Sequence, residues 1–176
     1  MIGIVIVAHG GLAREYLLAV EHVVGPQSGI AAVAIEDDHD RAAKTAEIQA
    51  AANAVDDGSG VVVVTDLFGG SPSNLSLPAC AVRDRTILYG ANLPMLVKLA
   101  KSRHLPVPDA VAFAKEAGRK YINSYNVPVE AVFDDNPRRS GLVFAVHIWN
   151  PSGPEPDSIW KVMSRQKDLQ YASRAA

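Results

Sequence analysis

Residues 2–8, IGIVIVA, and residues 60–66, GVVVVTD, decide the fold of this chain. Both are short, continuous runs that are rich in β-branched apolar residues. Runs of this kind, without polar alternation, are typical of strands covered on both faces, as in a parallel sheet. Residues 30–36 (IAAVAIE) and 86–91 (TILYGA) have the same character. The sequence therefore predicts four buried strands.

Segments with helical features separate and follow these strands. The predicted helices span residues 12–24, 40–55, 73–82, 94–102 and 107–122. Strands that alternate with helices predict right-handed crossovers and an open, doubly wound α/β sheet that is mostly parallel. We expect the strand order 2-1-3-4, which puts the topological switch between the first and third strands. A ligand site should then lie beyond the carboxyl ends of those two strands.

A histidine and a carboxylate stand at the expected switch point. The first strand runs into His9, and the third strand ends in Asp66. Because neighbouring strands lie about 4.8 Å apart, the two side chains are expected within hydrogen-bond reach. A carboxylate that accepts the proton of one ring nitrogen leaves the other nitrogen's lone pair free, as a nucleophile requires. It also stabilises the cationic ring that forms during phosphoryl transfer. The pair therefore predicts a catalytic site.

The loop after Asp66, LFGGSPSN at residues 67–74, predicts an anion-binding site. Glycines permit close backbone approach, hydroxyls donate hydrogen bonds, and the following helix would offer free N–H groups. Phosphoryl transfer depends mainly on positioning and charge stabilisation, so we expect no metal and no organic cofactor. A plain turn without a ligand is the alternative interpretation. The candidate phosphoryl-binding residues are Gly10, Gly69, Gly70, Ser71 and Ser73.

The bulk composition argues against several classes of protein. The 17 Lys and Arg residues nearly balance 19 Asp and Glu residues, and a net charge of −2 does not favour nucleic acid or anionic membranes as partners. The single cysteine, Cys80, excludes an internal disulfide framework and fits a reducing compartment. The first apolar run is too short to span a membrane and lacks a cleavage signature. We therefore expect a cytoplasmic protein without direct membrane insertion.

Three motifs together resemble a known family. They are IVIVAHGGLAREYLLAVEHVVG at 4–25, VVVVTDLFGGSPSN at 61–74 and GANLPMLVKLA at 90–100. The chain is similar over about residues 1–122 to the mannose-type enzyme IIA domains of the bacterial phosphoenolpyruvate-dependent sugar phosphotransferase system (PTS). As a combination, these motifs are highly specific.

The resemblance agrees with the site roles above and implies partners that the residues alone do not indicate. It makes His9 the phosphorylated nucleophile and Asp66 its hydrogen-bonding partner, and it puts Ser71 close to the phosphoryl group. It implies that the small carrier protein HPr donates the phosphoryl group and that a IIB component receives it. It also implies a homodimer that exchanges an edge strand, for which residues 120–133 are the best candidate.

The end of the chain departs from the family pattern. The family's domain ends near residue 130 or continues through a linker rich in alanine and proline, and residues 134–176 resemble neither. We expect a IIA-type domain over residues 1–133 and a C-terminal extension of unassigned role over 134–176. A strand over 141–149 and a helix over 157–173 are predicted within the extension.

Several functions stay open at the level of the sequence. The favoured one is a phosphocarrier in sugar uptake. A second is a regulatory module whose partner interaction depends on the phosphorylation state of His9. A third is a non-catalytic module that binds an anion or a small ligand in the crevice at the switch point, with His9 never phosphorylated. The phosphotransfer subunit of dihydroxyacetone kinases has a similar domain and is a further alternative.

Overall fold

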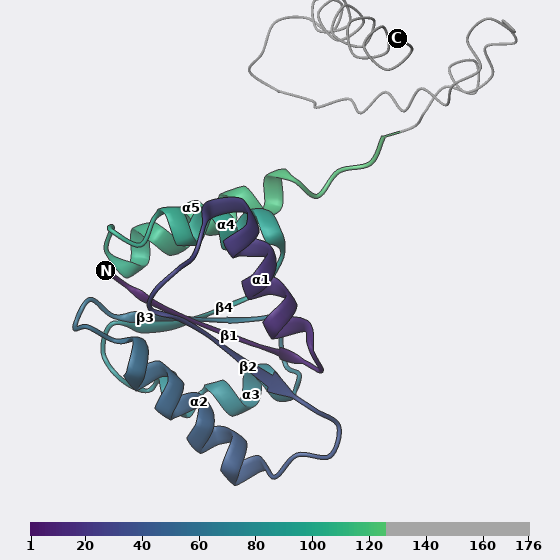
Figure 1. Cartoon of the computed structure of the whole chain (residues 1–176), viewed down its shortest axis with the longest axis vertical. Coiled ribbons are helices and arrows are strands. Elements are labelled where there is room, and N and C mark those ends of the chain that lie inside the picture. Colours follow the sequence, from purple (N-terminus) through teal and green to yellow (C-terminus); the bar gives the residue numbers. More distant parts are fainter. Residues whose placement is uncertain (126–176) are drawn as a thin grey trace, which may run out of the picture. The chain divides into compact units, whose positions relative to one another are not determined.

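A computed structural model describes residues 1–125 of the chain. Its four strands form one open, parallel sheet in the order β2-β1-β3-β4 (Figure 1). This confirms the predicted fold class and strand order. The strands are β1 (Gly3–His9), β2 (Ile30–Ile35), β3 (Val61–Thr65) and β4 (Arg85–Tyr89).

Helices cover both faces of the sheet (Figure 1). One face carries α1, α4 and α5, and the other carries α2, α3 and the short 3₁₀ helix η1. Their bounds are α1 (Leu12–Val24), α2 (Arg41–Val55), α3 (Ser71–Ser76), η1 (Pro78–Cys80), α4 (Leu93–Lys101) and α5 (Val107–Lys120).

The third helix differs from its prediction over residues 73–82. It begins at Ser71 and ends at Ser76, and the chain continues as η1. Pro72 suits the first turn of a helix because the amide hydrogen that it lacks would have no partner there. Pro78 has no N–H to donate and cannot continue the α-helix. The two prolines therefore explain both the earlier start and the earlier end.

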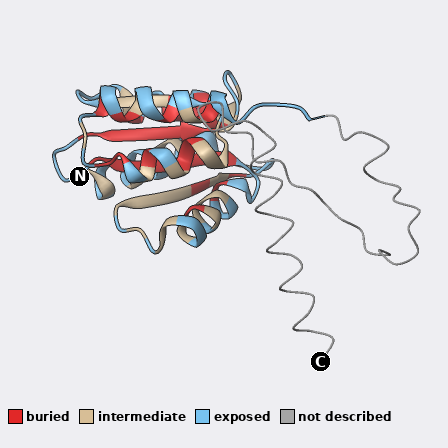
Figure 2. Cartoon of the chain, turned by 90° about the horizontal axis from the view of Figure 1, so that it is seen from above, coloured by how far each residue is buried: buried red, intermediate tan, exposed pale blue. Residues whose placement is uncertain are grey.

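The central strands β1 and β3 are buried apart from His9, which explains their continuous apolar sequence (Figure 2). The outer strands β2 and β4 are buried only in part, because each pairs with a single neighbouring strand, so the expectation of four buried strands holds for the two central ones. In β1, Ile4 and Ile6 pack toward α1, α4 and α5, whereas Val5 and Val7 pack on the side of α2 and α3. Burial of each such side chain contributes about 1.5–3 kcal/mol. The sheet therefore separates two hydrophobic cores.

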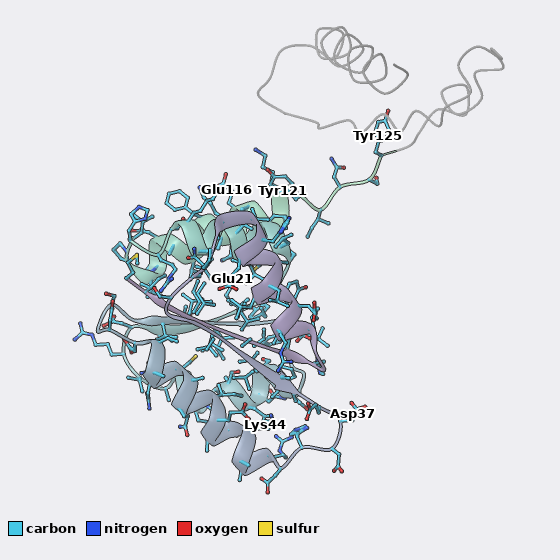
Figure 3. All side chains as sticks on the ribbon, in the orientation of Figure 1. Glu21, Asp37, Lys44, Glu116, Tyr121 and Tyr125 are labelled. Atoms are coloured by element: carbon cyan, nitrogen blue, oxygen red, sulfur yellow. The ribbon has the colours of Figure 1, made fainter. Side chains whose placement is uncertain are left out.

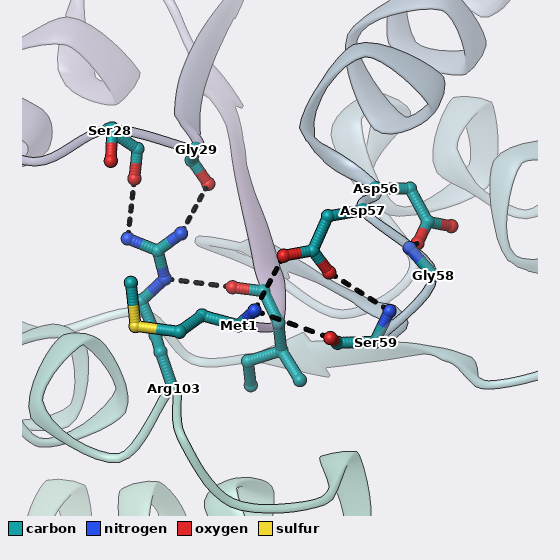
Figure 4. Close-up of polar contacts among 9 residues, drawn as sticks. Met1, Ser28, Gly29, Asp56, Asp57, Gly58, Ser59 and Arg103 are labelled. Atoms are coloured by element: carbon teal, nitrogen blue, oxygen red, sulfur yellow. Dashed lines mark hydrogen bonds and ion pairs between the residues drawn. The ribbon is translucent and has the colours of Figure 1, made fainter.

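The amino ends of the strands are held by polar contacts (Figure 4). Arg103 is buried, and its guanidinium donates to the carbonyl oxygens of Ile2, Ser28 and Gly29. The ammonium group of Met1 lies 2.6 Å from the Asp57 carboxylate, and this contact is the main cause that lowers the pKa of Asp57 to about 2. These contacts fix the sheet at the edge opposite to the predicted site.

Some predictions fall on or beyond the end of the described part. Residues 121–125 contain no strand, and the rest of the proposed exchange segment, up to residue 133, lies outside the described residues. The strand predicted over 141–149 and the helix over 157–173 also lie outside them. None of the helices within residues 1–125 has the length and apolar character needed to cross a membrane.

Candidate functional site

His9 and Asp66 meet at the carboxyl edge of the sheet. His9 is the last residue of β1, and Asp66 directly follows β3, which pairs with β1. The Asp66 Oδ2 atom lies 2.9 Å from the ring Nδ1 of His9 and accepts the backbone N–H of His9 at 3.0 Å. The strand order thus brings together two side chains that are 57 residues apart in the sequence.

The hydrogen bonds of Asp66 keep its carboxyl group ionised. Burial acts to raise the pKa of Asp66, but the N–H and ring of His9 and the N–H of Leu67 together lower it below its ordinary value. The other oxygen, Oδ1, accepts from Leu67 at 2.8 Å. An ionised acceptor at Nδ1 favours the neutral tautomer that carries its proton there, so the Nε2 lone pair is free. The side chain of His9 is 48% exposed, which leaves the ring accessible.

The glycine loop packs directly against the His9 ring. A Cβ atom on Gly70 would lie 3.1 Å from His9 Cε1 and 3.5 Å from Nε2. The preceding Gly69 has φ +78°, a conformation that favours glycine. Asn74 holds the loop, since its side-chain amide donates to the carbonyl oxygen of Gly69 at 3.1 Å. The loop therefore lies beside the free ring nitrogen because position 70 has no side chain.

The other predicted phosphoryl-binding residues occupy different environments. Gly10 has φ +52° and donates its N–H to Ile35 at 2.8 Å, so it turns the chain from β1 toward α1. Ser71 is the first residue of α3 and is partly exposed, whereas Ser73 is only 5% exposed. Within residues 1–125, no group of three or more His, Cys, Asp or Glu side chains is arranged to hold a metal ion.

An exposed apolar surface next to the site was not identified from the sequence. Phe68 is 70% exposed and Tyr89 is 52% exposed, with ring centroids 4.7 Å apart, and Leu67 beside them is also exposed. We call Leu67, Phe68 and Tyr89 the aromatic patch. The available signal was the pair Leu67-Phe68 directly after Asp66, where a turn usually has polar residues. The contact with Tyr89, at the end of β4, depends on the folded chain.

The fold and the site together define a class of protein. It is an α/β protein whose switch point carries a histidine–aspartate pair beside a glycine loop. Residues 3–114 of the chain, more than half of its length, match the family model described as PTS system fructose IIA component. The chain therefore belongs to this family of PTS IIA components, which confirms the resemblance seen in the three sequence motifs.

Individual proteins that are similar to this chain are also components of a phosphotransferase system. The mannose-specific EIIAB component of Escherichia coli K12 is 28% identical over 133 residues, which are 73% of this chain and 41% of the relative. The chain thus spans about two fifths of the length of that curated relative. The crystal structure of a phosphotransferase system component EIIA from Streptococcus agalactiae is 28% identical, with a TM-score of 0.61, over 70% of this chain and 97% of that chain.

A further solved structure has a similar score. The PTS IIA protein associated with the fucose utilization operon of Streptococcus pneumoniae is 25% identical, with a TM-score of 0.61, over 69% of this chain and 91% of that chain. The matched regions cover most of both solved proteins but leave about three tenths of this chain unmatched. Membership of the family supports a phosphotransfer role in a sugar PTS.

Proposed function

We propose that this chain is a phosphohistidine carrier that accepts a phosphoryl group from HPr on His9 and passes it to a IIB-type partner, in sugar uptake or its regulation. The observation that supports it most directly is the 2.9 Å contact between His9 Nδ1 and Asp66 Oδ2. This contact leaves Nε2 as the reactive nitrogen of an accessible ring.

The proposed transfer is a substitution at phosphorus. The lone pair of His9 Nε2 forms the new N–P bond, while the P–N bond of the phosphorylated donor breaks and its electron pair returns to the donor imidazole. Asp66 keeps the proton on Nδ1 and stabilises the positive charge that develops on the ring. Transfer to the IIB-type partner is the same substitution with His9 as the leaving group.

The transferred group would lie beside the glycine loop. Gly70 leaves space next to Nε2, and the partly exposed Ser71 is better placed than the buried Ser73 to donate a hydroxyl hydrogen bond. The backbone N–H of Gly69 completes the proposed phosphoryl-binding set, whereas Gly10 shapes the turn after His9, since its own N–H is donated to the carbonyl oxygen of Ile35. Positioning and charge stabilisation of this kind account for most catalysis of phosphoryl transfer.

The aromatic patch supports the proposal that the phosphoryl donor and the phosphoryl acceptor are both proteins. Exposed aromatic residues around a reactive group are typical of the centre of protein interfaces. The name of the E. coli relative, EIIAB, joins the A and B components in one protein, which supports a IIB partner for this chain.

We also propose a cytoplasmic location and a homodimer, both of which rest on the family resemblance.

Phosphorylation in a reconstituted system tests this function. The full chain is incubated with phosphoenolpyruvate, enzyme I and HPr, and acid-labile, base-stable phosphate is measured. We expect label on the wild type and on a His22→Ala control, since His22 is exposed on α1 and away from the end of β1. We expect no label on His9→Ala. Label retained by His9→Ala would contradict the assignment of the nucleophile.

A further inference from the structure

Tyr16 is connected to the His9–Asp66 pair by a series of backbone contacts. Its hydroxyl, on α1, donates to the carbonyl oxygen of Ala91 at 2.9 Å. The N–H of Ala91 donates to the carbonyl oxygen of Thr65 at 3.1 Å. Thr65 directly precedes Asp66, whose carboxylate binds His9. The Tyr16 hydroxyl is thus linked, through the backbones of Ala91 and Thr65, to the residue that precedes Asp66.

The contact between Ala91 and Thr65 lies where the sheet ends. The last paired residues of β3 and β4 are Thr65 and Tyr89, so the bond from Ala91 extends the pairing past Gly90 to the residue before Asp66. The hydroxyl of Thr65 is buried and has no hydrogen-bond partner among the described residues. The side chain of Thr65 therefore adds no hydrogen bond that would hold this position, and the contacts of its backbone do so.

Tyr16 holds Ala91 from the other side. Ala91 lies in the turn between Gly90, which has φ +81°, and Asn92, whose side chain caps α4. The bond from Tyr16 spans 75 residues and joins α1 to this turn. This hydrogen bond adds to the packing of α1, the helix that follows His9, against α4 in the segment that follows β4.

The charge of Asp66 acts on the Tyr16 hydroxyl. Burial raises the pKa of Tyr16, and the negative charge of Asp66 raises it further. Tyr16 therefore keeps its proton at neutral pH and remains a hydrogen-bond donor. The two groups are close enough to interact electrostatically, although they share no hydrogen bond.

We propose that Tyr16 is a positioning residue for the His9–Asp66 pair, which acts by fixing Ala91 and, through Thr65, the orientation of the Asp66 carboxylate. The kinetic part of this proposal rests on the proposed function. The structural part, the geometry of the pair, does not.

The first test is the protonation of the His9 ring. We would compare the ¹⁵N chemical shifts of Nδ1 and Nε2 in the wild type, in Tyr16→Phe and in Tyr121→Phe, at a pH where the ring is neutral. Tyr121 lies exposed at the end of α5 and is a matched control (Figure 3). We expect the chemical shifts of the two ring nitrogens to become more alike in Tyr16→Phe alone. A less well oriented Asp66 would favour the tautomer with its proton on Nδ1 less strongly. Unchanged shifts in Tyr16→Phe would overturn the proposal.

The second test separates positioning from binding. We expect Tyr16→Phe to lower kcat for HPr-dependent phosphorylation roughly threefold to tenfold, with KM for HPr unchanged, since one hydrogen bond that orients the pair is lost. In an Asp66→Asn background the same change should have no further effect, because Tyr16 acts through Asp66. A change confined to KM, an unchanged kcat, or additive effects would each overturn the proposal. If the wild type takes up no phosphate, the proposed function fails, whereas the ring-nitrogen comparison still decides the role of Tyr16.

Discussion

Gly70 lies directly against the ring of His9. Its missing side chain leaves the space into which the edge of the His9 ring, Cε1 and Nε2, projects. The backbone of Gly70 is extended, with φ −76°, so any residue can adopt it. Only steric contact with His9 therefore disfavours a larger residue at this position, which makes it a sensitive probe of the site.

We predict that Gly70→Ala lowers the rate of His9 phosphorylation by at least about tenfold, because even small displacements of reacting groups are costly in rate. The added methyl would lie 3.1 Å from His9 Cε1, and Asp66 limits how far the ring can move. Single-turnover labelling with phosphorylated HPr measures the rate.

Gly11→Ala is the matched control for that experiment. Gly11 has φ −73°, and a Cβ atom there would have no atom within 4 Å. We expect this variant to be labelled at nearly the wild-type rate. Equal rates for Gly70→Ala and the wild type would mean that the loop does not constrain the ring.

At the scale of the elements, the ends of β3 and β4 create a surface that neither strand has alone. The turn after β3 supplies Phe68, and the last residue of β4 supplies Tyr89. The strand pairing puts Thr65 opposite Tyr89, so the two rings meet beside the site. This arrangement suits a surface that a phosphoryl-carrying protein covers during transfer.

We predict that Phe68→Ser raises KM for HPr about tenfold and leaves kcat unchanged, since an exposed aromatic residue contributes to binding and not to the orientation of His9. Single-turnover labelling at varied concentrations of phosphorylated HPr gives both constants, from the limiting rate and the concentration at half of that rate. Leu77→Ser, at an exposed apolar residue at the end of α3, serves as the control. A similar rise of KM in both variants would argue against a specific role for the aromatic patch.

Arg85, the first residue of β4, connects this strand to α2 and η1 at the end of the sheet opposite to the site. Its guanidinium donates to the Asp56 carboxylate at 2.9 Å, to Asn53 at the end of α2 and to the carbonyl oxygen of Ala79 in η1. The side chain is only 7% exposed. We predict that Arg85→Met lowers the free energy of unfolding by about 3 kcal/mol, because it leaves a partly buried carboxylate without its partner. Urea denaturation at neutral pH measures the loss.

The pH dependence of this loss identifies its cause. Burial acts to raise the pKa of Asp56, but the N–H of Gly58 and the contact with Arg85 lower it below 3.8. The carboxylate therefore stabilises the fold fully above about pH 4, and this stabilisation disappears as the pH falls through the folded pKa. The difference between the wild type and Arg85→Met should shrink below pH 4. Arg83→Met, which changes a 94% exposed side chain, should have little effect at any pH.

At the scale of the whole molecule, the part that the structure describes contains the four-stranded sheet and the His9–Asp66 pair. All four strands and the helices that cover them lie within residues 1–125, and the family match covers residues 3–114. The proposed domain boundary at residue 133 and the proposed homodimer can therefore be tested together.

We predict that a chain cut after residue 133 is phosphorylated by HPr at the wild-type rate and forms a dimer, because the proposed site and exchange segment are both retained. Light scattering should give about twice the mass of one chain for this fragment and for the full protein, whose chain mass is 18.7 kDa. Loss of phosphorylation in the cut chain would contradict the boundary. A monomeric full-length protein would contradict the dimer.

The strands, the strand order and the site pair could be predicted because each depends on a local pattern or a general rule of topology. Continuous apolar runs determined the strands, and alternation with helices determined the parallel sheet. The switch-point rule then put His9 beside Asp66. The predicted range of the third helix, 73–82, was wrong at both ends. Pro72 favours a start before residue 73, and Pro78 prevents the α-helix from continuing to residue 82.

The amino-acid sequence by itself therefore determined the fold class, the family and the two residues at the centre of the site. Only the tertiary structure decided which other groups surround them: the edge of the His9 ring against Gly70, the aromatic patch, and the link from Tyr16 to Ala91. The reason is physical. Periodicity and turn chemistry act over a few residues, whereas contacts across 75 residues exist only after the crossover helices have packed on the sheet.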